Sequence, residues 1–283
     1  MAEIGKINNL KVARKQDFGI YLDGENLGEI LLPNKYIPEN TGLDDKLDVF
    51  IFFDSEDRII ATTEIPFVMT NQFAYLKVVS TTQIGAFLDW GLQKDLLVPF
   101  REQKRTMEMG KSYVVYVYLD EKSNRIAATT KIDKYLDIAE HNYKENDPVD
   151  LLICYKTDLG YKAIVNNAHW GVLYGSELFQ PLSVGQRIKG YIKKVRDDKK
   201  LDLSLSKSGI EKLADFAQLI IDKLEKNNGF LPVTDSSPTE DIYKLFGISK
   251  KAYKKAVGAL YKRRLIIIED KGIRIAQNIS NKP

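Results

Sequence analysis

An internal repeat of about 66 residues is the feature that most restricts the fold of this 283-residue chain. Residues 18–22 (FGIYL) resemble residues 84–88 (IGAFL), and residues 58–63 (RIIATT) resemble residues 125–130 (RIAATT). The offsets are 66 and 67 residues, so separate segments keep almost the same register. Two copies in register predict two tandem units with the same fold.

A third and more divergent copy follows. Its glycine-containing strand is expected at 160–165, with further strands at 171–178, 184–192 and 200–206, the last of which alternates with period two. Each copy has about five short strands in about 65 residues, separated by turn residues, which predicts a mainly β chain of small closed barrels. One large sandwich is the alternative, but the register of the repeat argues against it.

We therefore divide the chain into four units, 1–66, 67–140, 141–207 and 208–283, whose formal net charges are −6, +1, +3 and +5. This gradient predicts that the C-terminal half of the chain faces an anionic partner. The acidic first unit is instead suited to a protein partner.

The last unit changes to a helical period. Apolar side chains recur at three- and four-residue steps over 209–227, which predicts a first helix. A second, short helix is expected to have Ser237 as its N-cap and Pro238 as its first residue.

A third helix is expected over 250–263, capped by Ser249 and followed by strands at 265–268 and 273–275. This order of helices and hairpin is that of an α+β winged helix-turn-helix domain. A run of cations is commonly just a solvated helix face, but this one falls on the recognition helix and contains no acid, so it favours nucleic-acid contact. The cations are Lys250, Lys251, Lys254, Lys255, Lys262, Arg263 and Arg264.

The motifs of the third copy have a recognisable order. A Gly-x-x-x-x-Ser segment at 171–176 is followed by a Gly-x-x-Ile-x-Gly segment at 185–190 and by Leu-Ser-Leu-Ser at 203–206. This order resembles the S1-type RNA-binding domain, an OB-fold. Three such units followed by a basic helical region resemble the conserved virulence factor B family (CvfB/YitL-like). The resemblance implies three S1-type OB-fold β-barrels, a C-terminal winged helix, and RNA binding.

The same resemblance places the RNA-binding side chains. In S1 domains two stacking rings flank the glycine of the second strand, and polar residues lie near the last hairpin. The first repeat keeps both rings, the second keeps one, and the third has lost both but has other rings nearby and a basic hairpin. The candidates in the repeats are Phe18, Tyr21, Arg58, Phe87, Arg125, Tyr161, Lys162, Trp170, Tyr174, Lys193, Lys194, Arg196 and Lys200.

Several classes of site are not expected. The single Cys154 excludes an intramolecular disulfide and a multi-cysteine zinc site, and is expected to be a buried thiol. His141 is expected at the surface after a short helix at 134–140, and His169 in a turn. No catalytic motif, metal site or cofactor site is recognised. The N-terminus is unlike a signal peptide and the longest apolar run, 113–119, is too short to cross a bilayer, so a cytoplasmic location without membrane contact is expected.

The sequence thus favours a non-enzymatic protein that binds single-stranded RNA along one basic surface of the third barrel and the winged helix, and the family resemblance implies post-transcriptional regulation. Two alternatives remain open. One is a transcriptional regulator whose winged helix binds duplex DNA, and the other is a protein-interaction scaffold. In a transcriptional regulator the barrels would be sensor or dimer modules. A separate alternative is that the first two barrels are spacers or protein-interaction modules.

Overall fold

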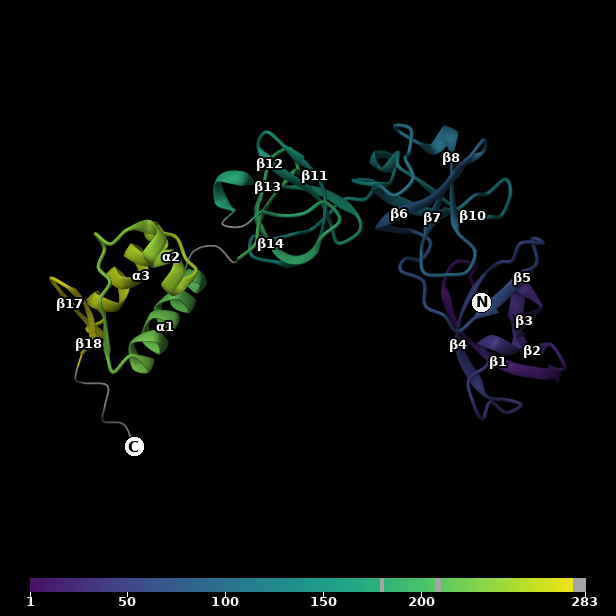
Figure 1. The fold of residues 1–283 in the computed structure, drawn as a ribbon, viewed down its shortest axis with the longest axis horizontal. Helices are drawn as coiled ribbons and strands as arrows, with labels where there is room; N and C mark the ends of the chain where they lie inside the picture. Colours follow the sequence, from purple (N-terminus) through teal and green to yellow (C-terminus); the bar gives the residue numbers. More distant parts are fainter. Residues whose placement is uncertain (179–180, 207–209, 277–283) are drawn as a thin grey trace.

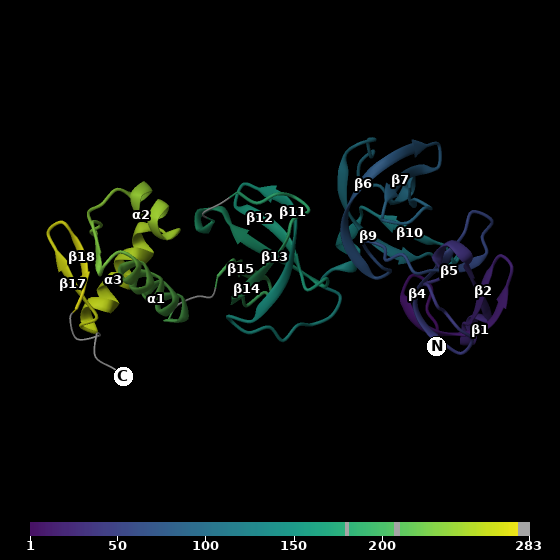
Figure 2. The same cartoon turned by 60° about the horizontal axis from the view of Figure 1, so that its bottom comes forward.

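The computed structural model describes residues 1–178, 181–206 and 210–276. Three β-barrels follow one another along the chain, and a small α+β winged-helix domain comes last (Figure 1). The first barrel and the winged-helix domain lie at opposite ends of an elongated molecule, as the turned view in Figure 2 also shows. The predicted fold class is therefore confirmed.

Each barrel has five strands that are joined in the same order. The first and third barrels are closed, whereas the second is nearly closed, because no ladder joins its β8 and β10. The expectation of a closed barrel is thus wrong in detail for the second copy. The strands are β1 Ile7–Gln16, β2 Gly19–Asp23, β3 Glu29–Pro33, β4 Lys46–Phe53 and β5 Ile59–Thr62; β6 Gln72–Thr82, β7 Gly85–Asp89, β8 Leu96–Pro99, β9 Ser112–Leu119 and β10 Ile126–Thr129; β11 Pro148–Thr157, β12 Gly160–Val165, β13 His169–Tyr174, β14 Arg187–Val195 and β15 Leu201–Ser204.

A steric constraint explains why the second strand of each barrel begins with glycine. A Cβ on Gly19, Gly85 or Gly160 would lie 2.4, 2.2 or 2.1 Å from a backbone carbonyl oxygen of the next strand. Only a residue without a side chain lets the two strands approach this closely. The first strand of each barrel also has a bulge at the equivalent place, which increases its coiling so that one strand pairs with two neighbours.

The winged-helix domain has its own apolar core. Its elements are α1 Ile210–Lys226, β16 Phe230–Leu231, α2 Thr239–Phe246, α3 Lys250–Lys262, β17 Ile266–Glu269 and β18 Gly272–Ile275. The predicted cap of α3 is confirmed, because Ser249 Oγ accepts a hydrogen bond from the Ala252 N–H. The predicted start of α2 is wrong by one residue. Pro238 is its N-cap, and Ser237 Oγ instead accepts from the Thr234 N–H.

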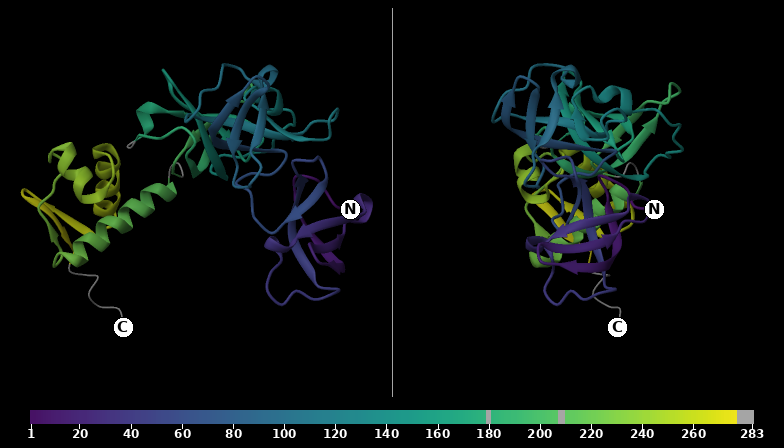
Figure 3. Two further views of the ribbon diagram at one scale, coloured as in Figure 1. Left: turned by 45° about the vertical axis from the view of Figure 1, so that its right-hand side comes forward. Right: turned by 90° about the vertical axis from the view of Figure 1, so that its right-hand side faces the viewer.

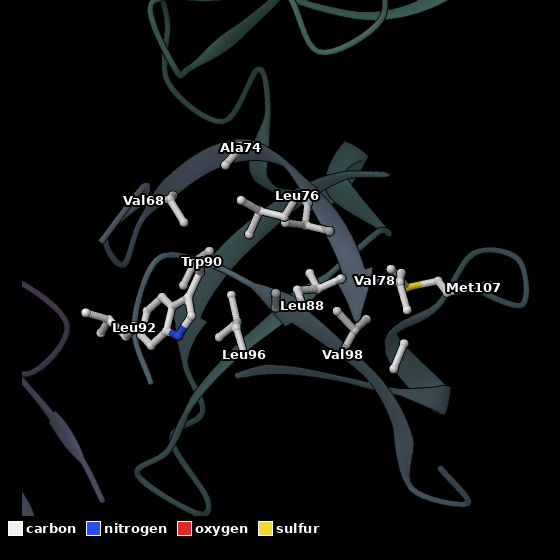
Figure 4. Packing of buried hydrophobic residues seen from close by; sticks show 14 of the residues in the cluster. Val68, Ala74, Leu76, Val78, Leu88, Trp90, Leu92, Leu96, Val98 and Met107 are labelled. Carbon is white, nitrogen blue, oxygen red and sulfur yellow. The ribbon is translucent and has the colours of Figure 1, made fainter. Parts of the chain in front are cut away.

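Apolar contacts join the three barrels. Phe50 and Phe52 point out of the first barrel and pack with Trp90 and other residues of the second barrel's core, with the ring centroids of Phe50 and Trp90 5.6 Å apart. Figure 4 shows Trp90 in this core, and Figure 3 shows the winged-helix domain set apart from the first two barrels. Phe73 of the second barrel packs with Leu152 of the third.

Two smaller expectations concern a short helix at 134–140 and membrane-spanning segments. The short helix expected at 134–140 is a 3-10 turn at Ile132–Tyr135. Within the described ranges, no helix has the length and apolar character needed to traverse a lipid bilayer.

Candidate nucleic-acid interface

The first barrel places two predicted rings together at the start of β2. Phe18, directly before the strand, is 57% exposed, and its ring centroid lies 6.2 Å from that of Tyr21 in an edge-to-face arrangement. The guanidinium of Arg14 lies 3.7 Å from the Tyr21 ring centroid and covers one face of that ring. Arg58 pairs with Asp54 at 2.7 Å. The ring of Phe18 is therefore the most accessible stacking surface of this barrel.

The second barrel brings Phe87 and Arg125 into one pocket of about 370 Å³. Tyr118 and Arg101, which were not among the candidates predicted from the sequence, line the same pocket. A ring-lined pocket with two guanidinium groups is suited to a base with its phosphate. The guanidinium of Arg125, however, forms an ion pair with Asp57 of the first barrel.

The first barrel also contributes to this pocket. Phe52 and Phe53 line it, and Lys94 Nζ donates a hydrogen bond of 2.6 Å to the carbonyl oxygen of Asp54. Burial lowers the pKa of Lys94. The turn between β4 and β5, with its acidic side chains, therefore lies against the rim of the second barrel's pocket.

The third barrel brings Lys162, Trp170 and Lys200 into a pocket of about 400 Å³. Lys162 Nζ lies 3.9 Å from the Trp170 ring centroid, which is a cation–π contact. Tyr155, on β11, adds a second aromatic ring outside the pocket lining, with its centroid 5.7 Å from that of Trp170. This arrangement can stack a base and bind a phosphate at one place.

The last hairpin of the third barrel is less basic than its sequence suggests. Arg196 pairs with Asp202 at 2.8 Å and also contacts the hydroxyl of Tyr174, which in turn donates to Asp202. Acidic neighbours pair with several more of its lysines, and Lys194 is the exception, exposed and without an ion pair among the described residues. These further pairs are Lys189–Asp150, Lys193–Glu177, Lys199–Glu140 and Lys200–Asp198.

The prediction that Tyr161 stacks a base is wrong. Its side chain is 8% exposed and belongs to the core of the third barrel. Neighbouring side chains of a strand point to opposite faces of the sheet. Lys162 faces the pocket, so the side chain of Tyr161 points into the barrel core.

The two histidines are also placed differently from expectation. His169 is the first residue of β13, not part of a turn, and it is 6% exposed. His141 is half-buried, with its Nε2 2.8 Å from the Lys199 carbonyl oxygen and its ring centroid 5.2 Å from that of His169. Burial, together with the charge of His141, lowers the pKa of His169.

In the winged helix, α3 separates its apolar and basic residues on opposite faces. Tyr253, Ala256, Val257 and Leu260 are buried against the domain core. Lys251, Lys254, Lys255, Lys262 and the 55% exposed Tyr261 form the outer face. Arg263 and Arg264 follow at the exposed end of the helix.

Two of the predicted lysines of α3 have partners within the domain. Lys250 Nζ donates to the carbonyl oxygens of Ser236 and Ser237, at 3.2 and 2.7 Å. Lys254 pairs with Asp235 at 3.4 Å. In the described ranges, by contrast, no ion pair neutralises Lys251, Lys255, Lys262, Arg263 or Arg264.

Metal and thiol chemistry find no support in the described part of the chain. There, no group of three or more His, Cys, Asp or Glu side chains could hold a metal ion. Cys154 is buried as predicted, and burial raises the pKa of its thiol to about 12. A thiol that stays protonated is a poor nucleophile and a poor metal ligand.

The residues that sequence reasoning missed are mostly rings. Tyr118 and Tyr155 lie in strands whose aromatic residues look like core, and Arg101 lies in a short 3-10 turn after β8. Tyr261, near the end of α3, is a further exposed ring. Helical spacing places Tyr261 one turn after the buried Val257, at the edge of the outer face, so its 55% exposure is what shows that the ring is accessible.

Comparison with known proteins places two family matches on the chain. The S1 domain family matches residues 4–64 and 72–131, and the CvfB-like winged helix domain family matches residues 218–275. Both S1 matches fall on the first two barrels, whereas the motif order had pointed most clearly to the third.

Similar proteins of comparable length have been found in bacteria. The chain is 28% identical over 280 residues to the uncharacterized protein YitL of Bacillus subtilis, covering 94% of this chain and 91% of that protein. It is 25% identical over 283 residues to conserved virulence factor B of Staphylococcus saprophyticus, covering 97% and 95%. A solved structure of a multidomain protein with nucleic acid binding domains, from Streptococcus pneumoniae, is 23% identical with a TM-score of 0.41, covering 96% of this chain and 98% of that one.

Proposed function

Because the chain belongs to the CvfB/YitL family, with S1 domains and a CvfB-like C-terminal winged helix, we propose that it is a non-enzymatic RNA-binding protein and a post-transcriptional regulator. Single-stranded RNA would run along the pocket of the third barrel and the outer face of α3. One observation carries this proposal: α3 and its C-terminal end present five cations without an ion pair among the described residues. Cations gathered in this way repel one another unless a polyanion spans them.

The third barrel adds further aromatic rings to the cations of α3. Trp170 and Tyr155 offer rings for unstacked bases, and Lys162 lies over Trp170, where it can bind the adjoining phosphate. The ion pairs of the basic hairpin do not prevent binding, because exposed pairs of this kind contribute only about 0–1 kcal/mol and a phosphate can replace the carboxylate.

Single-stranded RNA suits this surface better than duplex DNA. Rings in pockets stack on bases whose faces are free, and these faces are covered in a duplex. The outer face of α3 has no Asn or Gln to hydrogen-bond adenine edges, and its lysines are suited to phosphates. The winged-helix fold itself is the reason to keep duplex DNA as the competing ligand.

A competition experiment on the full chain tests the proposal. Labelled single-stranded RNA is bound at fixed salt and displaced with unlabelled single-stranded RNA, duplex RNA or duplex DNA of equal length. We expect single-stranded RNA to compete at the lowest concentration. Stronger competition by duplex DNA would favour a transcriptional regulator, and no binding of any of the three would favour a protein scaffold.

A further inference from the structure

The outer face of α3 has a gap in its row of lysines. Lys251, Lys255, Gly258 and Lys262 are spaced four, three and four residues apart, so they form one stripe along the helix. Gly258 lies in the middle of this stripe. A Cβ at Gly258 would meet no described heavy atom within 4 Å beyond its own stretch of helix.

Packing therefore does not explain the glycine. Apart from proline, glycine is the least favourable residue in a helix interior, and alanine would fit here without a clash. The fold gives up helix stability at Gly258 and gains no contact within the domain in exchange. A residue without a side chain at this open position leaves room for another chain to approach the helix backbone closely.

The end of α3 shows the reverse departure, because an arginine occupies a position where glycine is usual. Arg264 has a φ of +58°, in the left-handed region. Its N–H bonds the Tyr261 carbonyl at 2.9 Å, and the Leu265 N–H bonds the Leu260 carbonyl at 3.0 Å, which is the Schellman pattern. Glycine is the usual residue at this position, and α2 ends on Gly247 with a φ of +67°.

Alanine is preferred at position 258 and glycine at position 264. With Gly258 and Arg264 in these places, α3 is less stable than it needs to be at both. Both places lie on the surface with unpaired cations, and the exposed ring of Tyr261 lies three residues from each. Departures from local preference tend to lie where a protein binds a ligand. A common ligand would account for both departures.

We propose that the sugar–phosphate backbone of a single-stranded nucleic acid passes closest to the protein at Gly258. Lys255 and Lys262 bind phosphates on either side of it, Tyr261 stacks a base, and Arg264 binds the next phosphate. This inference rests on the proposed function and assigns the contact point on α3. Gly258 is a positioning residue, since it acts by leaving room for the strand.

The test measures stability and affinity together in the full chain. Gly258→Ala, Gly258→Leu and Arg264→Gly should each slow hydrogen–deuterium exchange of α3 amides and raise the Tm of the winged-helix domain by about 4–8 °C. The same variants should bind single-stranded RNA more weakly. At 0.15 M salt each lost phosphate contact corresponds to about a fourfold loss, so we expect about fourfold for Arg264→Gly and up to about 15-fold for Gly258→Leu.

Arg264→Lys is the matched control, because it keeps the charge and the strained backbone, and it should change neither quantity appreciably. Greater stability with unchanged affinity in the Gly258 variants would overturn the inference, and so would a loss of stability, which would give the glycine a packing role. Failure of the proposed function has a different result, because the wild-type chain would then bind duplex DNA more tightly than single-stranded RNA, or would bind neither.

Discussion

Replacing Lys251, Lys255 and Lys262 with alanine removes three exposed cations that have no ion pair in the described ranges. Alanine has the highest helix propensity, and none of the three side chains contributes to the core, so α3 should remain folded. Lys250 and Lys254 are left in place because they contact Ser236, Ser237 and Asp235. Any loss of binding then reflects lost contacts with the ligand and not unfolding of α3.

The size of the effect follows from counterion release. For a single strand, each neutralised phosphate contributes about 0.7 to the slope of log K against log salt concentration. Three lost contacts should therefore make the slope shallower by about 2. The corresponding loss of affinity is about 50-fold at 0.15 M salt and about 10-fold at 0.3 M.

Fluorescence anisotropy with a labelled single-stranded RNA, repeated at several salt concentrations, gives the slope directly. The control is the full chain with Lys46, Lys77 and Lys122 changed to alanine, because these exposed lysines of the first two barrels also have no ion pair among the described residues and their removal lowers the net charge by the same amount. We expect a much smaller change for the control. An unchanged slope in the α3 variant, or an equal change in both variants, would refute the argument that α3 binds the strand.

Further predictions concern the barrels. Trp170→Ala should weaken RNA binding by about 1–3 kcal/mol, as measured by titration, and Trp170→Phe should retain most of it; equal affinities would exclude stacking there. Asp57→Asn frees Arg125 from its ion pair and should raise affinity by up to about fivefold, whereas no change on titration would show that the second pocket is not used. The pKa of His169 is lowered from 6.5 in the folded state, so stability should fall as pH decreases below 6.5. Thermal unfolding should show this loss in the wild type, and His169→Gln should reduce it.

Part of the site was within reach of sequence reasoning and part was not. The resemblance selected Phe87, Arg125, Lys162 and Trp170, and the structure places them in two pockets as pairs. It also selected Tyr161, which is buried. A list of aromatic residues near a strand does not say which side of the strand each ring occupies, because a one-residue shift of register reverses every side chain.

Ion pairing in the third barrel is a second feature that the sequence does not predict. The sequence predicts a basic hairpin in the third barrel, yet ion pairs such as Lys199–Glu140 and Lys193–Glu177 neutralise much of it. The partners are 59 and 16 residues apart in the chain, so no local pattern pairs them. Apart from Lys250 and Lys254, the predicted cations of α3 and its C-terminal end have no ion pair among the described residues, and they lie together because a helix fixes which side chains share a face.

The amino-acid sequence alone determined the three barrels, the winged helix and the order in which they follow, because periods of two and of 3.6 residues are local properties that repeat along the chain. The tertiary structure decided that Asp57 pairs with Arg125, that Phe50 packs against Trp90, and which cations remain free. These contacts join residues from separate barrels or distant loops, and they depend on how the finished units pack together.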